Sequence, residues 1–270
     1  MSGYQNQNSD TPLESSRWSW FHGGFMLIAL LCCCTWAITE NARPRTPAFT
    51  RTSRSVRPEF DMQLVVSNQQ LAAVLKQIHP RFSREKTKVN YIDHALRMWG
   101  VKAEFSDGSY DGKKMLQLLT RQSAFSQEWG VQADPLLQMS RNGVRVTTQE
   151  GMTSVSHEDH LLGTLSEIGV PLDFKLETGS GPATVAHLLA DAVKTFRVNQ
   201  REYEWTALAA AFYAVDGTPW YSPDGQLVDF NVMARRLMRQ PQPLGVCYGQ
   251  HRLYSLTILL RIDDQMREEN

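Results

Sequence analysis

The sequence predicts a mainly α-helical protein with one N-terminal transmembrane helix and little β structure. Apolar residues recur at helical spacing in several segments that begin at capping residues and end at glycines. Polar or aromatic pairs open successive helices at intervals of roughly 45 to 66 residues, about one helical hairpin each. Such a period is typical of a solenoid or of a complete or partial α/α toroid, and an irregular helical bundle is the alternative.

Composition divides the 270 residues into four parts. Residues 1–17 form a polar tail, residues 18–39 an apolar segment, residues 40–59 a linker rich in Arg, Pro, Thr and Ser, and residues 60–270 one helical domain. Basic and acidic side chains number 28 each, so no net charge attracts the chain to nucleic acid. A nucleic-acid partner is therefore not expected.

The apolar segment at residues 18–39 contains no Asp, Glu, Lys or Arg, and its most apolar part runs from Phe25 to Ile38. About 22 helical residues at 1.5 Å each would cross a hydrocarbon core of about 30 Å. We therefore predict a single-pass membrane protein that contacts the lipid bilayer through this segment. A cleaved signal peptide is the alternative. The side of the membrane on which the domain lies stays open, because the Arg-rich linker favours the cytoplasm and a single N-terminal apolar segment favours export.

Three of the four cysteines, Cys32, Cys33 and Cys34, fall within this apolar segment, and Cys247 stands alone in the domain. A disulfide within the domain is therefore excluded. The triplet is typical of packing in lipid, with S-acylation or a bridge between chains as the alternative.

Helix-start and turn signals place the elements in the first half of the domain. Ser67 and Gln70 predict a capping box at the start of a helix. Further helices are predicted from Tyr91 to Trp99, after Gly112 and after Ser123. Residues 141–143 (Arg-Asn-Gly) are a turn signal before the alternating residues 144–146, so a small hairpin is expected here and little strand elsewhere.

The second half of the domain is predicted to be helical throughout, apart from a loop at residues 216–229. Ser156 is expected to cap a helix of about 13 residues, with Glu158 and Asp159 in its first turn, where the helix dipole favours acids. Further helical patterns cover residues 183–196, 201–215, 230–240 and 250–262.

Cys247 and His251 lie four residues apart where the last apolar helix begins. Unpaired backbone N–H groups at a helix start lower the pKa of a thiol, so this cysteine could bind zinc or act as a nucleophile. A zinc site needs three or four Cys, His or carboxylate ligands. If the helix starts converge, the other ligands come from Asp93, His94, His157, Asp159 and His160. The alternative is a buried cysteine beside a histidine that is hydrogen-bonded to a loop.

Two acidic or histidine-rich helix starts add candidate catalytic groups. His157 and His160 are three residues apart and share one face of the expected helix, which permits chelation, although capping explains the same pattern. Glu202 and Glu204 precede Trp205 at the head of an Ala-rich helix, so one of them could face the same centre as a general acid or base, and Glu204 is the candidate. An exposed first-turn glutamate is the alternative.

The segment Gly-Val-Cys-Tyr-Gly-Gln-His at residues 245–251, together with the recurring helix starts, resembles the α/α-toroid group of squalene cyclases, protein prenyltransferases and lanthionine cyclases. The similarity covers residues 85–262. Prenyltransferases and lanthionine cyclases of this group hold zinc with Cys and His, and the resemblance implies that Cys247 and His251 match those ligands. An Asp-rich terpene-cyclase motif, a Cys-His-Gly partner and a second domain cysteine are missing.

These observations lead to two hypotheses of different class. In the first, the domain is a zinc-dependent or thiol enzyme. Its metal ligands are drawn from His94, His157, His160, Cys247 and His251. Its catalytic groups are His160 or Glu204 for proton transfer and Cys247 with His251 for zinc or thiol chemistry. In the second, the domain is a noncatalytic scaffold that binds another protein of the cell envelope. The substrate, whether small molecule or protein, is not identified by the sequence.

Overall fold

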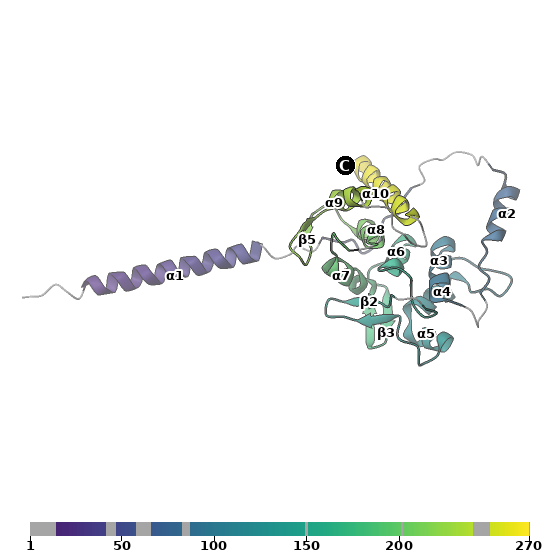
Figure 1. The fold of residues 1–270 in the computed structure, drawn as a ribbon, viewed down its shortest axis with the longest axis horizontal. Coiled ribbons are helices and arrows are strands. Elements are labelled where there is room, and N and C mark those ends of the chain that lie inside the picture. Colours follow the sequence, from purple (N-terminus) through teal and green to yellow (C-terminus); the bar gives the residue numbers. More distant parts are fainter. Residues whose placement is uncertain are drawn as a thin grey trace, which may run out of the picture. The chain divides into compact units, whose positions relative to one another are not determined.

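The computed structural model of the chain describes residues 15–41, 47–57, 66–82, 87–148, 151–200, 202–239 and 249–269. It divides into two compact units, Met1–Arg43 and Pro44–Asn270. Within the described residues there are ten helices and three antiparallel two-stranded sheets, which Figure 1 shows along the chain.

The first unit contains helix α1 (Ser15–Asn41), which is 27 residues long. None of the helices in the described ranges combines the length and the apolar character needed to cross a bilayer. The predicted transmembrane segment at residues 18–39 is therefore wrong, as is the predicted single-pass membrane localisation. The strongly apolar run from Phe25 to Ile38 forms only about 21 Å of helix, against a hydrocarbon core of about 30 Å. The expected bilayer contact has no spanning helix to support it.

The second unit contains the other helices and all the described strands. Its helices are α2 (Asn68–Gln77), α3 (Val89–Trp99), α4 (Gly112–Thr120), α5 (Gln122–Trp129), α6 (His160–Glu167), α7 (Val185–Thr195), α8 (Glu204–Tyr213), α9 (Phe230–Arg239) and α10 (Gln250–Glu269). Its hairpins are β1 (Leu137–Met139) with β2 (Val144–Val146), β3 (Lys175–Thr178) with β4 (Gly181–Thr184), and β5 (Trp220–Tyr221) with β6 (Leu227–Val228).

Helix α8 forms the centre of this unit. All of its residues are buried, and in Figure 1 it lies between α6, α7 and α10. The residues of α6 from His160 to Ser166 are buried as well. A β-carbon at Gly163 would lie 3.1 Å from the Trp205 ring, so the glycine lets α6 and α8 approach closely at this point. The starts of these two helices are therefore held together.

Several predicted helix boundaries are confirmed, and they depend on local signals. The capping box of Ser67 and Gln70 is present at the start of α2. Gly100 ends α3 with φ 77°, a conformation that glycine adopts without steric cost. Asp111 caps α4 by accepting a hydrogen bond from the backbone N–H of Lys114.

The prediction for Ser156 is wrong, because the helix begins only at His160. Asp159 is its N-terminal flanking residue and has φ 56°, in the left-handed region, so the preceding residues turn instead of extending the helix. The short α6 therefore presents His160 at its first position.

The low strand content predicted outside residues 144–146 is also corrected. The expected hairpin is confirmed, since Val144 pairs with Met139. Two further hairpins are present. In one hairpin, residues 181–184 form a strand, although a helix was predicted from residue 183. The other hairpin lies inside the predicted loop at residues 216–229.

Residues 47–57, part of the predicted linker, run along the second unit. The backbone N–H of Thr50 donates to the Tyr213 carbonyl over 2.7 Å. The side chain of Gln265 donates to the Ser55 carbonyl over 3.1 Å. This segment thus connects the end of α8 to α10, whose start carries one of the histidines of the candidate site.

Candidate metal centre

Four histidines, His94, His157, His160 and His251, are linked by ring contacts beside Trp205. The ring centres of His94 and His160 are 4.6 Å apart, and those of His157 and His160 are 5.8 Å apart. His251 lies 4.8 Å from His157 between ring centres. The indole of Trp205 contacts the group at 4.4 Å from His160 and 4.9 Å from His251. Helices α3, α6, α8 and α10 thus each contribute a ring at one place.

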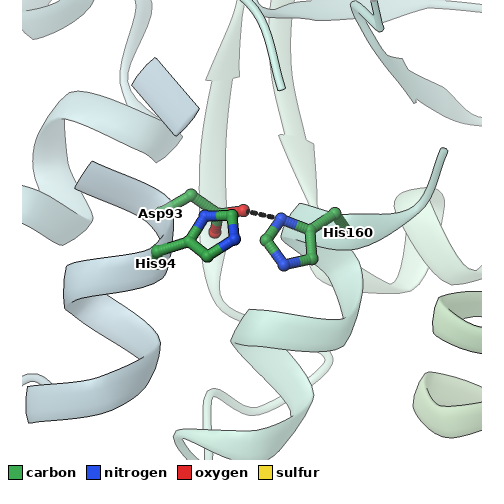
Figure 2. Close-up of side chains that lie close together, drawn as sticks. All are labelled: Asp93, His94 and His160. Carbon is green, nitrogen blue, oxygen red and sulfur yellow. Dashed lines mark ion pairs between the residues drawn. The ribbon is translucent and has the colours of Figure 1, made fainter. Parts of the chain in front are cut away.

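Asp93 and His160 form a fully buried ion pair at the centre of this group. The side chains of both are 0% exposed, and Asp93 Oδ2 contacts His160 Nδ1, as Figure 2 shows. Burial alone would raise the pKa of Asp93, but the neighbouring His160 outweighs it and holds the pKa below its usual value. The aspartate therefore stays charged and acts as an acceptor for the imidazole.

Asp93, His94 and His160 form a group that could hold a metal ion. Each offers one ligand atom, and these atoms lie within 4.8 Å of one another. Asp93 and His160 are buried, whereas His94 is exposed, so the group opens to solvent on the side of α3. In Figure 2 the His94 ring faces the His160 ring, with Asp93 beside them.

Two more of the histidines are fixed by oxygen acceptors at Nδ1. His94 Nδ1 lies 2.7 Å from the carbonyl oxygen of Asn90, one turn earlier in α3. His157 Nδ1 lies 2.9 Å from a carboxylate oxygen of Glu202. Glu202 has φ 54° and, with Asp159, is one of two non-glycine residues with positive φ in the described ranges. Unusual backbone is thus concentrated beside the histidines.

The imidazoles of His94 and His251 are kept neutral by their surroundings. Partial desolvation of the imidazole ring, which remains although the residue opens to solvent, and the nearby His160 lower the pKa of His94. Burial, followed by the neighbouring His157 and His160, lowers the pKa of His251 to about 4. Neutral imidazole is the form that binds metal, so at neutral pH these rings are in the required protonation state.

Glu204 lies at the start of α8, next to Trp205. Burial raises the pKa of its carboxyl group. Its Oε1 is 4.0 Å from the Arg252 guanidinium, and its Oε2 is buried without a hydrogen-bond partner among the described residues. The predicted general acid or base is therefore a buried carboxyl group, unlike the exposed first-turn glutamate of the alternative.

A second polar cluster, here called the clasp, consists of Arg97, Glu167 and Tyr254. Both nitrogens of the Arg97 fork contact Glu167, and the Tyr254 hydroxyl donates to Glu167 over 2.6 Å. The guanidinium lies 4.3 Å from the ring centre of Trp205 and 4.6 Å from that of Tyr254. The clasp joins α3, α6 and α10 directly beside the histidines.

Asp159 does not join the histidine group, although it was among the expected ligands. Its carboxylate accepts a hydrogen bond from the Thr206 hydroxyl over 2.5 Å. It lines a separate cavity of about 420 Å³ together with Glu158 and Asp191.

The structure brings together His94, His157, His160 and His251 from the predicted set. Cys247, the fifth predicted ligand, lies outside the described residues. The sequence did not single out Asn90 as a histidine partner, and its position four residues before His94 was the available signal, since such residues are neighbours on a helix.

Searches of protein-family models, of curated proteins and of solved structures found no match to this chain. The resemblance to the α/α-toroid group therefore stays a prediction.

Proposed function

We propose that this protein binds a zinc ion at the group formed by Asp93, His94 and His160. The observation that carries the proposal is the approach of their ligand atoms to within 4.8 Å of one another. Imidazole nitrogen and carboxylate oxygen are donors that zinc accepts, usually in tetrahedral sites of three or four protein ligands. Zinc is therefore the first ion to test.

A buried, unpaired nitrogen also supports a ligand at this place. His160 Nε2 is buried and has no hydrogen-bond partner in the described part of the chain. An unsatisfied buried polar group costs about 1–3 kcal/mol, and metal binding would remove that cost. The noncatalytic alternative expects these side chains to act separately as helix caps. Their convergence counts against it.

We further propose that the zinc ion serves a hydrolytic reaction. Structural zinc sites are closed and usually rich in cysteine, whereas catalytic sites have three protein ligands and an open position for water. The exposure of His94 leaves room for such a position. Zinc supplies the polarisation that turns water into a nucleophile, and Glu204 is the buried carboxyl group that would hold or move the proton. The thiol alternative depends on Cys247 and stays a prediction.

The test of the zinc site is an equilibrium titration of the purified full chain with Zn²⁺ in competition with a chromophoric chelator. One tight site per chain is expected for the wild type. His160→Gln should lose it, while His187→Gln should keep it. His187 is an exposed histidine in the capping box of α7, where glutamine is also a natural residue, so this control changes the same side chain elsewhere. A folded wild-type chain that binds no zinc would contradict the proposal.

The test of hydrolysis uses chromogenic carboxylic and phosphoric esters with the zinc-loaded chain. Chelator treatment should abolish turnover, and added zinc should restore it. Glu204→Gln should keep the zinc and lower turnover by about 10²–10⁴-fold, the usual contribution of a general acid or base. Equal turnover in this variant would remove Glu204 from the proposal.

A further inference from the structure

The ring of His160 is closed off from solvent. Both of its nitrogens are buried, and the side chain is 0% exposed. An ion or a substrate therefore reaches these nitrogens only when an element that covers the ring moves. Rings on three other helices lie around it: His94 on α3, Trp205 on α8 and His251 on α10.

Helix α10 is the least firmly held of these helices. Only four of its 20 residues are buried, and two of those, Ser255 and Gln265, are polar. By contrast, every residue of α8 is buried, as are seven of the eight residues of α6 and four of the 11 residues of α3. Burial of apolar side chains is the main force that holds a helix in place, and elements with few such contacts open most easily. Among the helices around His160, α10 should therefore move first.

The first turns of α10 form the cover over the histidine group. His251 stacks on His160 with 6.4 Å between the ring centres and 24° between the ring planes. Its ring centre is 4.9 Å from that of Trp205, and Tyr254 belongs to the clasp. In Figure 1, α10 lies along the outside of the second unit next to α8 and α9. Movement of its start would carry His251 away and uncover the ring of His160.

Residues 47–57, here called the strap, hold the other end of α10. The side-chain amide of Gln265 accepts a hydrogen bond from the Arg57 backbone N–H over 3.0 Å and donates to the Ser55 carbonyl over 3.1 Å. The Arg57 guanidinium also forms an ion pair with Glu268 over 2.6 Å. One glutamine thus binds the strap through two backbone groups, and an ion pair adds to this contact.

The strap is anchored in turn to the end of α8. The backbone N–H groups of Thr50 and Arg54 donate to the carbonyls of Tyr213 and Phe212 over 2.7 and 2.8 Å. The Arg54 guanidinium donates to the Ala214 carbonyl over 3.2 Å. Because α8 is fully buried, the strap ties the weakly held α10 to the most firmly held helix of the unit.

We infer that α10 is a lid over the metal centre and that the strap holds this lid closed. When the strap is released, α10 moves away from α8 and uncovers the ring of His160. An agent that displaces residues 47–57 therefore opens the centre. The regulatory role rests on the proposed zinc site, whereas the movement of the lid does not require an ion.

The test measures two reporters in the metal-free full chain. Hydrogen exchange followed by mass spectrometry reports on the backbone amides of residues 254–260 in α10. Carbethoxylation by diethyl pyrocarbonate, mapped to single residues by mass spectrometry, reports on access to His160. Gln265→Leu removes both hydrogen bonds to the strap with little change in volume, and Arg54→Ala removes the guanidinium contacts with α8. Both rates should rise about 10-fold or more in each variant, because each loses at least two hydrogen bonds.

Asp263→Ala is the matched control, because it breaks an exposed ion pair with Arg267 within α10 itself. It should react like the wild type in both measurements. The exposed His94 should be carbethoxylated alike in all four proteins and so serves as the internal reference. Zinc should bind to the two strap variants about 10-fold or more faster than to the wild type, with one ion per chain in each protein.

The inference is overturned if His160 in the two strap variants reacts at the wild-type rate, or if Asp263→Ala reacts as fast as they do. It is also overturned if their zinc-binding rates equal that of the wild type. A wild type that binds no zinc would instead contradict the proposed function, and the carbethoxylation of His160 would still decide whether α10 is a lid.

Discussion

The histidine group and the clasp are two polar clusters between the same helices, and they differ in how completely their atoms are paired. In the clasp, Arg97 contacts both oxygens of Glu167, and Tyr254 donates to the same carboxylate. In the histidine group, His160 is more deeply buried than any member of the clasp, and its Nε2 has no hydrogen-bond partner in the described ranges. A fully paired cluster holds helices together, whereas an unpaired buried nitrogen marks a place where a ligand is missing.

This difference assigns separate roles to neighbouring residues. The clasp connects α3, α6 and α10, so it contributes to folding and fixes the walls of the site. The histidine group contains a buried contact as well, between Asp93 and His160, but its side chains are the ones that offer ligand atoms for an ion. Variants of the two clusters should therefore separate stability from metal binding.

The largest effect is expected from Glu167→Ala. It leaves the Arg97 guanidinium, whose side chain is 18% exposed, without its anion. Removing one partner of a buried ion pair costs about 3–5 kcal/mol, and we expect the lower end of that range, about 3 kcal/mol, because Arg97 retains some contact with water. Chemical denaturation measures this change, and the zinc stoichiometry of the folded variant should be unchanged.

The control for this variant is Asp173→Ala, which breaks an ion pair with Arg51 whose side chains are 75% and 54% exposed. Exposed pairs contribute little, so the free energy of unfolding should fall by no more than about 0.5 kcal/mol. Similar losses in both variants would mean that the clasp is no more important than a surface pair.

The second effect is stabilisation by zinc. An ion that binds only the folded chain raises the free energy of unfolding by about 2.7 kcal/mol when its free concentration is 100 times the dissociation constant. Thermal denaturation with and without zinc measures this increase. It should disappear in His160→Gln and persist in Tyr254→Phe, because only the first variant removes a ligand.

The third effect concerns Asp159. Its carboxylate accepts a hydrogen bond from a hydroxyl group, whereas the carboxylate of Asp93 contacts an imidazole. Burial raises its pKa to about 7, against the opposing hydrogen bond from Thr206. The folded state therefore holds more protons than the unfolded state between about pH 4 and pH 7, and the stability contributed by the protonated form is lost as the pH rises through this window.

Asp159→Asn should remove this pH dependence and make the chain more stable than the wild type above pH 7. We expect a difference of about 2 kcal/mol, less than the full pKa shift would give, because the residue is partly exposed. The measurement is denaturant unfolding at pH 5 and pH 8 in the presence of chelator. If the wild type gained stability relative to Asp159→Asn as the pH rose from 5 to 8, the pKa of Asp159 would be shifted in the opposite direction.

The smallest effect is expected from Tyr254→Phe. The ring remains in contact with Arg97, and only the hydrogen bond to Glu167 is lost. Such a bond contributes about 1 kcal/mol. Denaturant unfolding should detect this loss, and a change as large as that of Glu167→Ala would show that the ring packing is also disturbed.

Part of the candidate site could be predicted because its residues share a local signal. Each of His94, His160 and His251 lies in or at the start of an apolar helix, and that common placement indicated convergence before any contact was known. Asp93 and Glu202 were among the candidate residues, but the ring that each one contacts could not be predicted in the same way. These pairings depend on how α3, α6 and α8 pack, and the left-handed conformation of Glu202 leaves no mark in the sequence.

The same distinction between local signals and tertiary contacts explains which parts of the fold could be predicted. Capping boxes and glycine stops are local, so the boundaries of α2 and α3 were predictable. The β3–β4 hairpin was missed because residue 183 fits a helical pattern as well as a strand, and its pairing with residue 176 decides between them. The transmembrane prediction is wrong because an absence of charged residues does not by itself give a long enough apolar helix, and the strongly apolar part of this segment is short.

The most direct test of the zinc centre is a crystal of the full chain grown with zinc and measured on both sides of the zinc absorption edge. The account predicts one strong anomalous peak within about 2.0–2.2 Å of ligand atoms of Asp93, His94 and His160. A peak elsewhere on the chain, or none with these three side chains well ordered, would contradict it.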